Sequence, residues 1–163
     1  MMLGMSLAAF TLLHVIISLV GIASGFIVVF GMLSAKRLDA WTGLFVLTTV
    51  LTSVTGFGFP FTHLLPSHKV GIISLVVLAI AILARYSFHM AGKWRWIYVV
   101  TAMIALYLNV FVLVVQSFEK VPALRTMAPT QSEPPFLVAQ LVVLAIFIVL
   151  TIFTVKKFHP DGL

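Results

Sequence analysis

The sequence predicts an all-α protein, a single integral membrane bundle of about five transmembrane helices with the N-terminus outside and the C-terminus in the cytoplasm. The first observation is composition: 62% of the 163 residues are hydrophobic and only 9% are charged, whereas soluble domains average about 45–50% apolar and about 25% charged residues. The second is that the apolar residues form runs long enough to cross a bilayer. The third is that basic residues fall between those runs.

The predicted spans are residues 7–33, 41–61, 70–90, 96–118 and 136–155. The first lacks a basic n-region and is too long for a signal peptide, so we interpret it as a retained span. Gly56-Phe57-Gly58-Phe59-Pro60 weakens the second and is more typical of a kink or a helix stop. The connector 119–135 contains four of the seven prolines and is predicted to be irregular. Residues 1–163 thus form one predicted transmembrane domain.

Basic residues set the predicted orientation. The net charge is +6, from ten Lys and Arg against four Asp and Glu. Five spans place seven basic residues on one side: Lys36, Arg37, Arg85, Lys93, Arg95, Lys156 and Lys157. The other side receives Lys69, Lys120 and Arg125. Because cytoplasmic loops are enriched in Lys and Arg, the first group is predicted to be cytoplasmic. This charge pattern suits lipid phosphates, and it needs no nucleic acid to explain it.

Two further features fit the cytoplasmic boundary. Aromatic residues cluster there, as in an aromatic belt: Trp41, Trp94, Trp96 and Tyr98. Arg85 and His89 are predicted to extend toward lipid phosphates at this surface.

Polar residues inside the spans are expected to face the bundle interior. Most of them lie in the outer half: His14, Ser18, Thr52, Thr55, Asn109, Gln116 and Gln140. His63 and His68 lie in the outer connector above them. The sequence therefore predicts an outward-facing polar pocket, closed toward the cytoplasm by packed aliphatic side chains. Gly21 and Gly25 add a small-residue face for helix contact, self-association or a membrane-protein partner.

Catalytic signatures are missing. The chain has no cysteine, and HExxH, Walker and GxSxG patterns are absent. The four carboxylates, Asp39, Glu119, Glu133 and Asp161, lie outside the apolar spans. We therefore expect no hydrolytic or nucleotide-driven reaction and assign no catalytic residue.

Histidine is the remaining residue type that could bind a cofactor or a metal ion. His14 and His63 are the best-placed pair to bind a haem b iron from two sides, with Asn109 and Gln116 in the same pocket and Lys69, Lys120 or Arg125 near the propionates. Alternatively, His14, His63 and His68, with Glu133 or water as a further ligand, bind Cu(II) or Zn(II). A chain without a cofactor is an equal alternative.

Three functions follow as hypotheses. The first is a redox-cofactor protein in electron transfer or a respiratory complex. The second is a channel or transporter that uses the same pocket as its outer vestibule. The third is a structural accessory subunit. The proline-rich segment 121–135 is interpreted either as a fixed lid over the pocket or as a passive linker.

Three segments resemble a family of small, uncharacterised, polytopic proteins of the bacterial inner membrane. They are TTVLTSVTGFGFPF (48–61), ARYSFHMAGKWRWIYVVTA (84–102) and APTQSEPPF (128–136). The resemblance covers most of the chain. It implies a bacterial inner membrane and a periplasmic outer side, and it implies no activity and no functional residue.

Overall fold

The predicted all-α class is confirmed by a computed structural model that describes residues 3–160. The helices are α1 (Leu7–Leu33), α2 (Asp39–Gly56), α3 (Pro66–Ile82), η1 (Leu83–Ser87), α4 (Trp94–Lys120), α5 (Pro122–Met127) and α6 (Pro134–Lys157). No β-strand occurs among these residues. Asp161, one of the four carboxylates, lies outside the described part of the chain.

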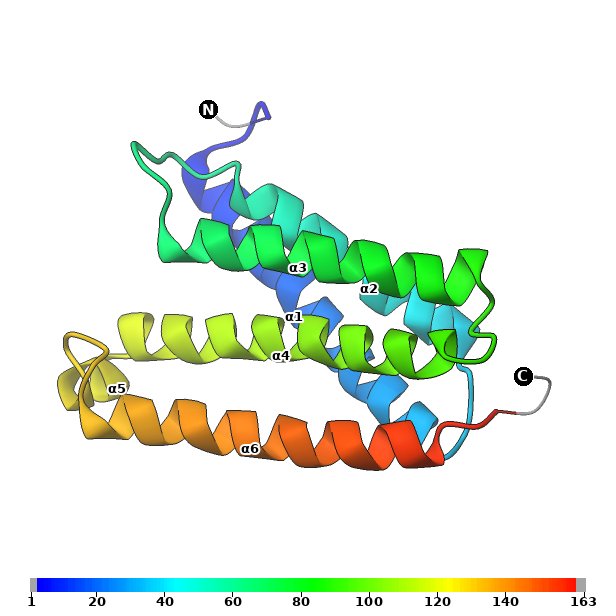
Figure 1. Ribbon diagram of the computed structural model, residues 1–163. Coiled ribbons are helices and arrows are strands. Elements are labelled where there is room, and N and C mark those ends of the chain that lie inside the picture. The colour runs from blue at the N-terminus through cyan, green and yellow to red at the C-terminus, as the bar shows by residue number, and fades with distance from the viewer. Residues whose placement is uncertain (1–2, 161–163) are drawn as a thin grey trace.

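Five long helices run back and forth between two ends of the molecule (Figure 1). We call one end the histidine end; it contains the 57–65 turn between α2 and α3, together with α5. The opposite end, which we call the arginine end, contains the α1–α2 loop, the turn into α4 and the C-terminal end of α6. Helix α4 lies at the centre and packs against α1, α2, α3 and α6.

Four of the helical segments are long and apolar enough to span a membrane. They are Leu7–Leu33, Pro66–Ser87, Trp94–Lys120 and Pro134–Lys157. Helix α2 is not among them. Its 18 residues reach about 27 Å at 1.5 Å per residue, slightly less than the hydrocarbon core of a bilayer, and six of them are Ser or Thr. A fifth crossing therefore stays a prediction.

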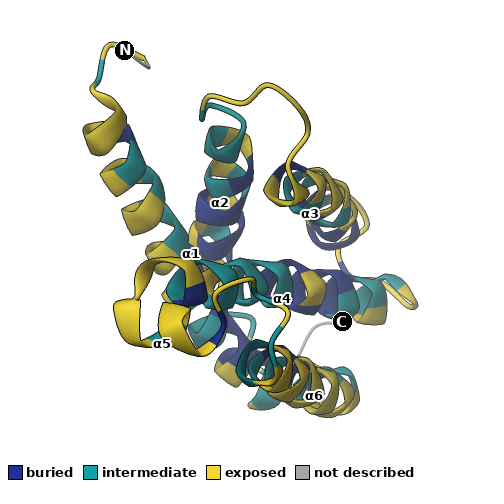
Figure 2. Ribbon diagram, turned by 90° about the vertical axis from the view of Figure 1, so that its left-hand side faces the viewer, coloured by how far each residue is buried: buried dark blue, intermediate teal, exposed yellow. Residues whose placement is uncertain are grey.

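The apolar surface is distributed as a bilayer would require. Large exposed aliphatic and aromatic side chains cover the outer faces of α1, α3 and α6, while buried residues gather on α4 and on the sides of the helices that face it (Figure 2). In water such an uncovered surface would be unfavourable, because burial of apolar area is the main driving force of folding. In lipid it is the expected exterior.

Helix boundaries differ from the predictions at the prolines and glycines. Helix α2 ends at Gly56, five residues earlier than predicted, because the 57–61 segment turns away. Pro66 starts α3 and Pro134 starts α6, since proline at the first helical position forfeits no hydrogen bond. The connector predicted to be irregular contains the short helix α5, which Pro122 begins.

The third predicted span has an unusual end. Residues Leu83–Ser87 form a π-helical turn, in which Phe88 N–H donates to Leu83 O at 2.9 Å. His89 and Met90 then take positive φ values of 50° and 55°, which are uncommon for residues other than glycine. A π-helical turn widens a helix locally and often accompanies a functional site. Here the turn directs the Arg85 side chain toward the interior of the bundle.

Candidate functional site

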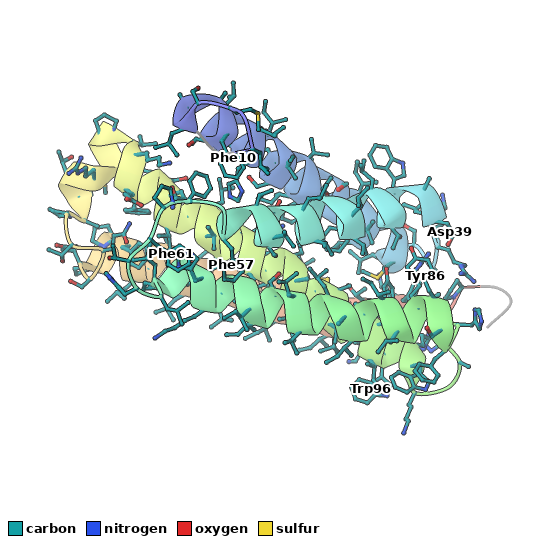
Figure 3. All side chains as sticks on the ribbon, turned by 90° about the horizontal axis from the view of Figure 1, so that it is seen from above. Phe10, Asp39, Phe57, Phe61, Tyr86 and Trp96 are labelled. Carbon is teal, nitrogen blue, oxygen red and sulfur yellow. The ribbon has the colours of Figure 1, made fainter. Side chains whose placement is uncertain are left out.

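The 57–65 turn gathers aromatic rings and two histidines at the histidine end. Phe10 and Phe59 pack edge to face with centroids 5.1 Å apart. Gly58 permits this contact, because a Cβ at that position would lie 2.7 Å from the Phe10 ring. Phe57 and Phe61 extend toward α3 at the same end, as Figure 3 shows. The alternating phenylalanines of the turn therefore contact α1 on one side and α3 on the other.

His14 is held by a hydrogen bond that defines its tautomer. Its Nδ1 lies 2.7 Å from Thr55 Oγ1, and the same hydroxyl donates to Leu51 O at 2.6 Å. A threonine hydroxyl has one proton. Because that proton is directed to Leu51, the hydrogen-bond pattern assigns the shared proton of the His14 contact to Nδ1. Nε2 of neutral His14 is then unprotonated, which is the form that binds a metal or accepts a proton.

His68 has a different role. It is only 3% exposed, and its ring contacts Phe57 and Phe61 at centroid distances of 5.3 and 4.2 Å. Its Nδ1 accepts the Leu65 N–H at 3.0 Å, so the histidine caps the first turn of α3. Neutral His68 therefore carries its proton on Nε2, and neither ring nitrogen is an available ligand in this arrangement.

His63 is exposed on the turn, where its Nδ1 lies 3.3 Å from Thr62 Oγ1. The structure does not bring the three predicted metal ligands together: no group of three or more His, Asp or Glu side chains within residues 3–160 is placed to hold a metal ion. Of the three histidines, His14 is the one whose hydrogen bond to Thr55 leaves Nε2 without a proton.

The predicted polar residues of the outer half lie between helices and are largely bonded to protein. Asn109 Nδ2 donates to Thr49 Oγ1 at 3.4 Å, beside Gly21, where a Cβ would lie 3.1 Å from Thr48 Oγ1. Ser53 donates to Ser74 at 3.2 Å. Thr48, Thr52 and Thr55 donate to carbonyls four residues earlier, the usual structural role of threonine in a span.

Two glutamines lie nearer the α4–α6 contact. Gln116 is half-buried on α4. Gln140 is buried and its Nε2 donates to Phe111 O at 3.3 Å, while its Oε1 lacks a partner among the described residues. The Gln140 amide ties α6 to α4, and neither glutamine shares a hydrogen bond with the His14–Thr55 contact.

Arg125 is exposed on α5 and lines a cavity of about 520 Å³ with Lys120. Thr130 and Glu133 define the neighbouring loop: the Glu133 carboxylate accepts the Thr130 hydroxyl at 2.7 Å and the Ser132 N–H at 3.1 Å. The Thr130 hydroxyl holds the pKa of Glu133 below its ordinary value. No histidine lines this cavity, so the structure does not place Arg125 in one pocket with His14.

At the arginine end, the position of the Arg85 side chain contradicts the sequence prediction. Arg85 is 2% exposed, so the prediction that its side chain extends to lipid phosphates is wrong. It forms an ion pair with Asp39, donates to Arg37 O at 3.3 Å and lies 5.1 Å from the centre of the Tyr98 ring. The Asp39 side chain remains 70% exposed. Asp39 and Tyr86 lie at the end of the bundle opposite Phe57 and Phe61 (Figure 3).

A related prediction also fails in part. The aromatic-belt prediction is wrong for Tyr98, which is 1% exposed; Trp41 and Trp96 are exposed as a belt requires. A charged cluster of Arg37, Asp39 and Arg85 lies at the same end. The signal is present in the sequence: an arginine inside a span needs a partner at the same depth, and Asp39 is the carboxylate next to that boundary.

A second arginine, Arg95, connects α4 to the C-terminal end of α6 at the arginine end. Arg95 Nη1 donates to Val155 O at 2.9 Å and to Phe158 O at 2.8 Å, which satisfies carbonyls at the C-terminal end of α6.

Comparisons with protein-family models, with curated proteins and with solved structures found no match to this chain.

Proposed function

We propose that the protein crosses a bacterial inner membrane five times, with the histidine end in the periplasm. The support is the division of basic residues between the two ends of the bundle. Seven of the ten Lys and Arg residues belong to segments at the arginine end, and Lys69, Lys120 and Arg125 belong to the histidine end. The positive-inside rule assigns the arginine end to the cytoplasm. The bacterial membrane follows from the family resemblance of the sequence.

The function we propose is binding of a redox cofactor, haem b, at the histidine end, for electron transfer or as a small subunit of a respiratory assembly. The observation that supports it is the His14–Thr55 hydrogen bond, since a haem-ligating histidine has its second ring N–H bonded to an acceptor in this way. The surrounding Phe10 and Phe59 rings provide an apolar environment.

His63 is the proposed second ligand. His68 Nδ1 already accepts the Leu65 N–H, whereas His63 lies exposed on the same 57–65 turn. Two histidines from α1 and from this turn would hold the iron at the level where the bundle meets the periplasm.

The test is the absorption spectrum of the purified protein, oxidised and then reduced with dithionite. We expect a Soret band and, on reduction, an α band. His14→Ala should abolish both, because it removes the ligand-competent imidazole. His68→Gln should keep the bands, since that ring caps a helix. His159→Ala, an exposed histidine near the arginine end, is the matched control and should leave the spectrum unchanged.

A colourless preparation, or bands that survive His14→Ala, would reject the cofactor proposal. The transport and accessory-subunit hypotheses would then remain. Transport has support from the contact of Asn109 with Thr49 beside Gly21, which places an amide and hydroxyls between α1, α2 and α4.

A further inference from the structure

A second candidate site lies at the histidine end, in the cavity of about 520 Å³ where α4 ends. Three parts of the chain line it: the last turn of α4, helix α5 and the 129–131 segment. Gln131 Nε2 donates to Val115 O at 2.9 Å, which fastens the segment back onto α4. The walls of the cavity are therefore connected to one another.

The charges that line the cavity are unpaired. Lys120 and Arg125 belong to neither of the two ion pairs formed among residues 3–160. Glu119 also lines the cavity without pairing with either of them. Glu133, the other nearby carboxylate, is occupied by Thr130 and Ser132. Two cations and one carboxylate thus leave a net positive cavity.

The cavity lies at the boundary between apolar and polar surface. Helix α4 belongs to the segments long and apolar enough to span a membrane, and the cavity begins at its last turn. Val121 and Met127, at the two ends of α5, are exposed, as expected for side chains at the level of the lipid headgroups. Phe118, buried against Phe136 with centroids 5.5 Å apart, supplies an apolar floor.

We propose that this cavity binds a phosphate group. Arginine presents a planar fork that fits phosphate oxygens, and lysine adds a point charge. The phosphate is supplied either by the headgroup of a phospholipid, whose acyl chain would then lie beside Phe118, or by a soluble anion. No histidine lines the cavity, so neither proposed haem ligand belongs to it.

The experiment measures binding to the whole chain, delipidated in a maltoside detergent at an ionic strength of about 0.15 M, where the Debye length is about 8 Å. The probes are dihexanoyl phosphatidylglycerol, dihexanoyl phosphatidylcholine and inorganic phosphate, each titrated by calorimetry. We expect saturable binding, weakened about tenfold or more by the Lys120→Gln/Arg125→Gln double variant, since charge-assisted hydrogen bonds to phosphate are strong. Tighter binding of phosphatidylglycerol than of inorganic phosphate identifies a lipid as the source; equal binding identifies a soluble anion.

Lys69→Gln is the matched control, because Lys69 is the third basic residue of the histidine end and does not line the cavity. It should change the affinity less than about twofold, since an exposed charge that does not contact the bound phosphate is largely screened at this ionic strength. Arg125→Lys should give an intermediate loss, since the charge remains and the fork is removed. Lys120 and Arg125 are both exposed, so helical circular dichroism should be unchanged. Absence of saturable binding, or equal losses for Lys69→Gln and the double variant, would overturn the proposal.

Discussion

Arg85 is a permanently charged side chain near the end of a largely apolar helical segment, and its surroundings explain how the fold accommodates it. The ion pair with Asp39 and the bond to Arg37 O satisfy one terminal nitrogen, and the face of Tyr98 lies against the guanidinium. Arg85 Nε and the Tyr98 hydroxyl have no partner among the described residues. The contact with Asp39 is the one ion pair of Arg85 among the described residues, and it offsets part of the cost of burying this charge.

For this ion pair we predict that Asp39→Ala lowers the free energy of unfolding by about 1–2 kcal/mol. The substitution leaves a buried guanidinium with weaker compensation, and the exposure of Asp39 to solvent limits the loss. Unfolding by sodium dodecyl sulfate in mixed micelles, followed by circular dichroism, measures it. Glu119→Ala removes an exposed carboxylate outside any ion pair of the described residues and should change stability far less. Equal effects of the two variants would show that the pair contributes nothing.

The contacts of single residues are the hardest feature to predict from the sequence. The sequence identifies His14 because a histidine within an apolar run is conspicuous. It does not identify the tautomer, since that depends on Thr55, which lies 41 residues away. The prediction for Arg85 fails for the same reason: Asp39 is 46 residues distant, and periodicity within one helix cannot reveal a partner on another.

Helix packing depends on small residues where backbones approach closely. Gly25 on α1 faces α2 and α4, and a Cβ there would lie 2.6 Å from Leu106 Cδ1 and 3.0 Å from the Phe45 ring. Both neighbours are 1% exposed, so they have little room to move. The small-residue contact predicted from Gly21 and Gly25 is therefore a contact within the chain.

We predict that Gly25→Ala lowers the free energy of unfolding by about 1–3 kcal/mol through overpacking. Gly43→Ala is the control: a Cβ added at this position of α2 would meet no atom within 4 Å, so alanine should raise stability by about 0.5–1 kcal/mol through helix propensity. The same micelle unfolding assay compares them. Stabilisation by both substitutions would contradict the close approach at Gly25.

Elements are more predictable than residues. The hydrophobic runs locate all five long helices, since run length is a local property of the sequence. The ends are displaced where proline and glycine act, as at Gly56 and Pro66. Helix α5 escapes prediction because six residues give too short a pattern, although Pro122 at its first position is a recognisable start signal.

The whole molecule has two unlike ends. One gathers histidines, phenylalanines and the phosphate cavity; the other gathers seven basic residues and the Arg85–Asp39 pair. A bundle with five crossings separates these ends across the membrane. With four crossings, α2 would not cross the bilayer, and the segments before and after it would lie on the same side. The number of crossings therefore decides every assignment of side.

Labelling of single cysteines tests the five crossings most directly, because the natural chain has no cysteine. Ser34→Cys, Ser67→Cys and Ser132→Cys are exposed positions before α2, after α2 and before α6. We predict that a membrane-impermeant maleimide labels Ser67→Cys and Ser132→Cys in intact cells with a permeabilised outer membrane, and labels Ser34→Cys only after the inner membrane is opened. Labelling of Ser34→Cys and Ser67→Cys from the same side would contradict five crossings, since α2 would then not cross the membrane.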